Sequence, residues 1–123
     1  TGDFRSDSGY DATRAVLESE RRPRALFIGN FMMALGALRA IRELGLRIPD
    51  DVGLISFDDM PWAAAMNPPL GAVAQPVREL GRTAAELLLD RIGDPERPAR
   101  RIVLDTELVV RESCGTRKLE EVK

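Results

Sequence analysis

Two short apolar runs with an amphipathic segment between them constrain this fold most. The runs are Ala25–Ile28 and Val52–Phe57, and each has the length of a buried strand. Between them, apolar side chains recur every three or four positions in Phe31–Leu44, which predicts a helix. A strand, a helix and a strand joined by short connections form a βαβ unit, whose strands run parallel. The sequence therefore predicts an α/β fold in which helices flank a parallel sheet.

Capping residues define both ends of the central helix. Asn30 precedes it, where its side chain can accept a hydrogen bond from a backbone amide of the first turn. Gly45 follows it, at a position that favours a left-handed residue, and Leu46 can supply the accompanying hydrophobic contact.

The other elements are assigned from apolar periodicity bounded by proline and glycine. The expected helices span Asp7–Ser19 and Pro76–Ile92, and the expected strands are Gly71–Gln75, Arg101–Leu104 and Glu107–Val110. Three prolines in Met60–Leu70 predict an irregular loop. Residues 116–123 are expected to form a polar, frayed tail.

Composition excludes several classes of function. Eighteen Lys and Arg residues nearly balance twenty Asp and Glu residues, so charge gives no case for binding nucleic acid or an anionic membrane. No apolar stretch is long enough to span a bilayer and no signal peptide is visible, so no membrane association is expected. The single cysteine, Cys114, fits a reducing cytoplasm. The chain begins with Thr1 in mid-pattern, which suggests a fragment or a processed chain.

Catalysis is also not expected. The chain contains no histidine, which removes the commonest general base and the commonest zinc ligand. Neither a phosphate-binding glycine loop nor a nucleophile paired with a base is visible. We therefore expect no enzyme, no metal site and no cofactor.

Short motifs follow one another in a characteristic order along nearly the whole chain. They are Gly2-Asp3-Phe4, Ser8-Gly9-Tyr10, Arg22-Pro23 through Ile28, Met33 to Ala40, Glu43 to Val52, Phe57-Asp58-Asp59, Pro68-Pro69-Leu70, Gln75-Pro76, Gly81-Arg82 with Ala84-Ala85, and Leu108 to Ser113. With these motifs in this order, the chain resembles the effector domain of the lactose/galactose-repressor family from Gly2 to about Gly115.

The resemblance implies an incomplete periplasmic-binding-protein-like fold with flavodoxin-like subdomains. In that family, two such subdomains flank a cleft that closes on a small effector, such as a sugar or a related metabolite. Residues 1–74 would supply part of the C-terminal subdomain, and residues 75–115 the crossover and elements of the N-terminal subdomain. The protein would be a cytoplasmic transcriptional repressor. Operator DNA would be bound, as a homodimer, by a helix-turn-helix headpiece that is absent from this chain.

Four residues are candidate effector contacts. Asp58 follows a predicted strand, where its carboxylate could accept hydrogen bonds from hydroxyls or ring nitrogens, or could cap a turn instead. By resemblance, Asn30 would add a hydrogen bond, in addition to its role as a helix cap. Phe4 would stack on a flat face of the effector, or belong to the core. Gln75 would enter the cleft at the crossover, or act as a cap or hinge contact, whereas Asp59 is expected to be structural.

Two departures from the family pattern affect the effector. Phe31 stands where relatives usually carry Asp after the position of Asn30. Gly71-Ala72-Val73-Ala74 replaces the usual Thr-Thr-Val-Arg before the glutamine. Both changes make the surroundings less polar, so the identity of the effector cannot be carried over from the family.

The central helix and the proline-rich loop are candidates for a dimer interface. In the family these two elements form the subunit contact, and here they carry more large side chains than one core-facing stripe requires. The candidate interface residues are Met32, Leu35, Leu38, Arg39, Trp62 and Met66. The alternative is that the apolar members belong to the core of the monomer.

Two other classes of protein remain open. A periplasmic solute-binding protein shares the architecture with two subdomains, but would carry an export signal and no headpiece. A small α/β enzyme would need one of the catalytic constellations that are not visible here.

Overall fold

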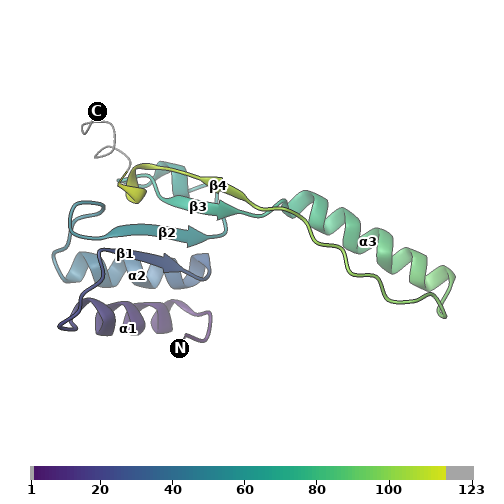
Figure 1. The fold of residues 1–123 in the computed structure, drawn as a ribbon, viewed down its shortest axis with the longest axis horizontal. Helices are drawn as coiled ribbons and strands as arrows, with labels where there is room; N and C mark the ends of the chain where they lie inside the picture. Colours follow the sequence, from purple (N-terminus) through teal and green to yellow (C-terminus); the bar gives the residue numbers. More distant parts are fainter. Residues whose placement is uncertain (1, 116–123) are drawn as a thin grey trace. The chain divides into compact units, whose positions relative to one another are not determined.

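The computed structural model describes residues 2–115, so the tail predicted at 116–123 lies outside the described residues. The chain consists of two compact units (Figure 1). Of the described residues, the first contains 2–74 and 108–115, and the second is Gln75–Glu107. Leu108 to Gly115 thus group with the first unit, while the assignment of either unit to a family subdomain stays a prediction.

A four-stranded sheet in the order β1-β2-β3-β4 organises the first unit. Its strands are β1 (Ala25–Ile28), β2 (Gly53–Phe57), β3 (Gly71–Ala74) and β4 (Glu107–Val109). β1 pairs with β2, and β2 with β3, both in parallel. The predicted α/β fold is confirmed, and its parallel strands put the carboxyl ends of β1, β2 and β3 at one edge.

Two helices pack in layers beside the sheet. α2 (Phe31–Glu43) contacts β1 and β2, and α1 (Ser6–Leu17) packs against α2 (Figure 1). The two helices approach closely because glycine stands at the contact. A Cβ atom added to Gly36 would collide with the Ser6 carbonyl, and one added to Gly9 would collide with the Met33 backbone.

The core lies between α2 and the sheet. Ala34, Ala37 and Ile41 present small and medium side chains from α2 to β2 and its neighbours. Its buried hydrophobic members are Leu17, Ile28, Ala34, Ala37, Ile41, Val52, Leu54, Ala63 and Leu70. Burial of this apolar surface is what favours the βαβ arrangement over the open chain.

Both predicted caps of α2 are confirmed. The Asn30 side chain accepts a hydrogen bond from the Met33 amide at 2.8 Å. Gly45 is left-handed, with φ of 68°, and the Leu46 amide donates to the Ile41 carbonyl at 3.0 Å. This six-to-one bond is the Schellman ending that the glycine predicts.

Ser113 fastens the last described segment of the chain to the sheet. This segment forms a short 3-10 turn, η2 (Glu112–Cys114), and Ser113 is buried. Its hydroxyl donates to the Leu54 carbonyl at 2.6 Å and accepts from the Gly71 amide at 2.8 Å. One side chain therefore links the C-terminal segment to both β2 and β3.

The second unit consists of α3 (Val77–Gly93) and an extended return segment. The prediction of a strand at Arg101–Leu104 is wrong, because these residues adopt no regular structure. A strand requires backbone partners on a neighbouring strand, and the described residues of this unit offer none beside it. Instead Ile102 and Leu104 share a shallow pocket with Leu80 and Leu87 of α3.

The expected loop at Met60–Leu70 is irregular apart from one 3-10 turn, η1 (Ala63–Ala65). Within the described residues, no helix is both long enough and apolar enough to cross a membrane.

Candidate functional site

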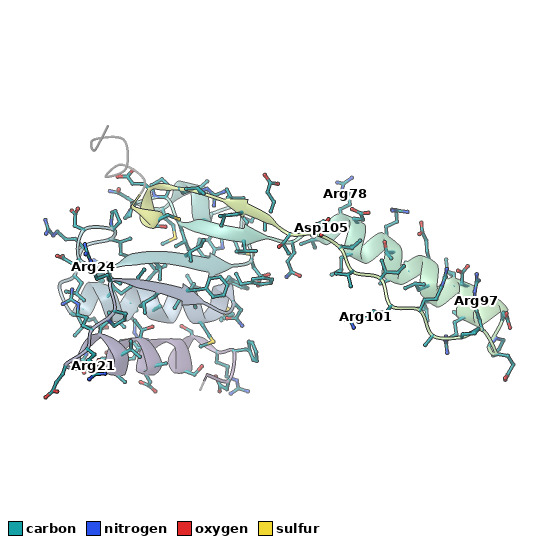
Figure 2. The ribbon with its side chains drawn as sticks, in the orientation of Figure 1. Arg21, Arg24, Arg78, Arg97, Arg101 and Asp105 are labelled. Atoms are coloured by element: carbon teal, nitrogen blue, oxygen red, sulfur yellow. The ribbon has the colours of Figure 1, made fainter. Side chains whose placement is uncertain are left out.

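The carboxyl edge of the sheet gathers three of the four candidate effector contacts. Ile28 of β1 pairs with Ser56 of β2, so Asn30 and Asp58 each lie two residues beyond paired positions. The Asn30 side-chain amide donates to the Phe4 carbonyl at 3.1 Å, which brings Phe4 to the same edge. In Figure 2, Arg24 marks the opposite edge, where β1 begins, and Arg21 lies near the end of α1.

Asp58 has an unusual backbone at this edge. Its φ is 74°, in the left-handed region, and its amide donates to the Val73 carbonyl at 3.0 Å. Aspartate tolerates this conformation better than most residues. The chain thus turns sharply at Asp58 and leaves its side chain half-buried at the strand end.

Phe4 also has a left-handed backbone, which is less favourable for phenylalanine than for aspartate. Its φ is 66°, and its side chain is 67% exposed, so it is not part of the described core. A bulky residue in the left-handed region is an outlier, and such strain concentrates at functional sites. Phe4 and Asp58 are the non-glycine residues with positive φ among those described, and both are candidate effector contacts from the sequence.

Gln75 opens the second unit directly after β3, and its side chain is half-buried. Its role at the effector site stays a prediction, as do the effector contacts of Asp58, Asn30 and Phe4.

Asp59, the neighbour of Asp58, belongs to an ion pair. Its two carboxylate oxygens accept from the Arg111 guanidinium at 2.7 and 2.8 Å, and Arg111 also donates to the Leu70 carbonyl at 2.7 Å. The side chains are 21% and 18% exposed, respectively. The Arg111 hydrogen bond lowers the pKa of the Asp59 carboxyl, although desolvation opposes the change.

The sequence does not reveal the role of Arg111 near the site. Arg111 lies 52 positions from Asp59, and a single sequence contains no signal that pairs one arginine with one carboxylate at that distance. Its effect is to hold the segment after β2, the residue before β3 and the C-terminal segment together.

Phe31, the departure from the family pattern, packs on another candidate residue. Its ring centroid lies 6.1 Å from that of Trp62, with the planes tilted by 59°. An aromatic pair therefore adjoins Asn30 at the start of α2.

Comparison with known proteins identifies the family. Residues 1–114 match the model of the periplasmic binding protein-like domain. The chain belongs to the periplasmic-binding-protein-like family. Its resemblance to repressors of the lactose/galactose group within this family is confirmed as well.

Relatives in the family are transcriptional regulators. The ribose operon repressor of Escherichia coli K12 is 40% identical over 114 residues, covering 93% of this chain and 34% of the relative. The HTH-type transcriptional repressor PurR of Aliivibrio salmonicida is 39% identical over 112 residues, covering 91% and 34%. The solved complex of the transcriptional regulator CelR with cellobiose has a TM-score of 0.83 and 42% identity, covering 91% and 34%. The chain therefore spans about a third of the length of these family members.

The interface expected from the family falls on α2 and the loop after β2. Met32 and Leu35 are 39% and 40% exposed, respectively, whereas Leu38, Trp62 and Met66 are partly buried against the core. The alternative that the apolar candidates belong to the core of the monomer therefore applies in part to Leu38, Trp62 and Met66. The interface itself remains a prediction.

The Arg39 side chain is held on the surface of the same helix. Its guanidinium lies 4.0 Å from the centroid of the Tyr10 ring and 3.6 Å from the Glu43 carboxylate. A groove of about 700 Å³ runs between α2 and the loop, with Leu38, Arg39 and Met66 among its lining residues. Both candidate interface elements thus border one concave surface of this family member.

The described part of the chain, residues 2–115, contains no group of three or more Cys, Asp or Glu side chains placed to hold a metal ion.

Proposed function

We propose that the chain forms part of the effector-binding and dimerisation domain of a DNA-binding transcriptional repressor. The observation that carries the proposal is the meeting of Phe4, Asn30 and Asp58 at the carboxyl edge of a parallel sheet, with Phe4 and Asp58 in left-handed backbone. In open α/β sheets, ligands are usually bound at this edge. The repressor names of the sequence relatives support the regulatory role.

The effector is a small hydroxylated molecule with at least one flat apolar face. The Asp58 carboxylate accepts hydrogen bonds from its hydroxyls, and the exposed Phe4 ring stacks on the face. A sugar fits this chemistry, and one structural relative is a cellobiose complex. The aromatic pair of Phe31 and Trp62 makes the surroundings less polar, which favours an effector less hydrophilic than a free monosaccharide.

Regulation follows from a shift between cleft geometries. An effector that binds one orientation of the subdomains more tightly changes operator affinity by its difference in binding free energy. DNA contact belongs to a headpiece outside this chain, and the protein acts as a homodimer in the cytoplasm. Catalysis has no part in this function. The repressor names of the relatives favour this function over that of a periplasmic solute-binding protein.

A thermal-shift screen tests the proposed effector class. The panel contains ribose, cellobiose and a less polar glycoside of each sugar. A ligand that binds only the folded state raises the melting temperature, and a concentration of 100 times Kd stabilises by about 2.7 kcal/mol. Stabilisation by at least one member supports the proposed effector class. Each glycoside is expected to raise the melting temperature more than its free sugar does. No shift with any member at millimolar concentration would refute it.

A further inference from the structure

The turn that carries Phe4 is braced by hydrogen bonds on both sides. The Arg5 amide donates to the Asp3 carboxylate at 3.0 Å, and the Ser8 hydroxyl accepts from the Asp3 amide at 3.1 Å and donates to the Arg5 carbonyl at 3.0 Å. These bonds hold the residues before and after Phe4. None of these three donors reaches the Phe4 carbonyl, which accepts from a fourth donor.

That donor is the Asn30 side chain, which uses both ends of its amide. The oxygen accepts from the Met33 amide at 2.8 Å and so caps α2. The nitrogen donates to the Phe4 carbonyl at 3.1 Å. One side chain therefore fastens the strained turn to the first turn of a helix packed on the sheet.

This connection has a consequence for the Phe4 ring. A left-handed backbone is unfavourable for phenylalanine and persists only where surrounding contacts impose it. The ring itself is mostly exposed, so core packing does not impose the conformation. The hydrogen bonds of the turn constrain it instead, and of those described the bond from Asn30 reaches Phe4 directly.

We propose that Asn30 is a positioning residue, which fixes the Phe4 carbonyl so that the ring is held ready to stack on the effector. This inference rests on the proposed function, and differs from the direct effector contact that the family resemblance implies for Asn30. Its advantage for binding is preorganisation, because a ring fixed in advance loses less conformational freedom when the effector binds.

Asn30→Asp separates the two roles of the side chain. The carboxylate still accepts from the Met33 amide, and a negative charge is favourable at a helix N-terminus, so α2 keeps its cap. The donor to Phe4 is lost, and an acceptor faces the carbonyl instead. In the ligand-free protein, NMR should show a loss of the strong intraresidue NOE between the Hα and amide protons of Phe4, which marks a positive φ. An unchanged NOE would overturn the proposal.

The double-mutant cycle with Phe4→Gly tests how Asn30 affects binding. Calorimetric titration uses ribose and cellobiose as probes. Asn30→Asp should weaken binding about tenfold in the wild-type background. This factor corresponds to the free energy of holding one residue in a strained backbone conformation. In Phe4→Gly, whose backbone accepts positive φ without strain, the same change should have little further effect. An equal tenfold loss in both backgrounds would mean that Asn30 contacts the sugar directly, which overturns the proposal.

Failure of the proposed function gives a different result. If wild-type protein binds no member of the sugar and glycoside panel, the proposed effector class is refuted, while the NOE in Asn30→Asp still decides whether Asn30 holds Phe4.

Discussion

Asp58 and Asp59 are adjacent in the sequence and have different surroundings. Asp59 accepts both of its short hydrogen bonds from Arg111. Asp58 lies at the left-handed turn that ends β2. Neighbouring carboxylates can thus take separate roles, because one is held by a fixed cation and the other lies at the edge where the sheet presents its strand ends.

The Asp59–Arg111 pair should make stability depend on pH. The pKa of Asp59 is lower in the folded protein than in the unfolded chain, so the pair stabilises above a pH of about 4 and loses its effect as the pH falls through the lowered folded pKa. Asp59→Asn should lower the free energy of unfolding by about 2 kcal/mol at pH 7, since the charge-assisted bonds are lost. The deficit should shrink below a pH of about 4. Urea unfolding at several pH values measures it.

The exposed Asp11 provides the matched control for this substitution. Asp11→Asn should change the free energy of unfolding by no more than about 0.5 kcal/mol at any pH. A deficit in Asp59→Asn that persists undiminished in acid would contradict the assignment of the effect to the ion pair.

Among the secondary-structure elements, the contact between α1 and α2 matters most for the candidate site. It carries the loop of Phe4 at the start of α1 and the cap of Asn30 at the start of α2, so their packing sets the geometry of the site. The two glycines at the contact allow the backbones to approach. A change in helix separation should therefore affect both stability and effector binding.

Gly36→Ala should destabilise the protein by about 1–3 kcal/mol, because the added methyl group meets backbone atoms of Ser6 and Tyr10 that cannot turn aside. Gly81→Ala is the control, since Gly81 lies in α3 and, apart from its chain neighbours and the nearby backbone of α3, no described heavy atom lies within 4 Å of the place of an added methyl group. Alanine also favours a helix over glycine by about 1 kcal/mol. Thermal unfolding followed by circular dichroism compares them. Equal stability of Gly36→Ala and wild type would show that the helices do not pack this closely.

Local and long-range features differ in how far the sequence predicts them. The βαβ unit and both caps of α2 follow from periodicity and from Asn30 and Gly45, whose effects are local. The pair of Arg111 with Asp59 depends on a contact between distant segments, which one sequence does not specify. The wrong strand at Arg101–Leu104 has the same origin, because apolar residues alone do not provide a neighbouring strand. The sequence likewise does not predict the left-handed backbone of Phe4, because this conformation is usual for glycine or asparagine and not for phenylalanine.

At the scale of the whole molecule, the chain spans about a third of the length of its curated relatives. The expected homodimer places α2 and the loop after β2 between subunits, where Leu35 is exposed and Met66 borders the groove. Symmetric contact through one face is the usual geometry of such dimers.

Sedimentation velocity tests the dimer. The double variant Leu35→Glu with Met66→Glu should sediment as a monomer, since each subunit would bring two uncompensated charges into an apolar contact. Val16→Glu is the control, because Val16 is exposed on α1, outside the candidate interface, and the protein should stay dimeric. A double variant that remains dimeric at micromolar concentration would remove this face as the interface.

The most direct test of effector binding at the carboxyl edge is calorimetric titration of Asp58→Asn beside wild type, with the best ligand from the sugar panel. Asparagine tolerates the left-handed backbone of Asp58, so the change removes the charge with little disturbance of the turn. Binding should weaken by about 2 kcal/mol, or roughly thirtyfold in Kd, while the melting temperature of the free protein stays near that of wild type. Unchanged affinity in Asp58→Asn would contradict the placement of the effector at this edge.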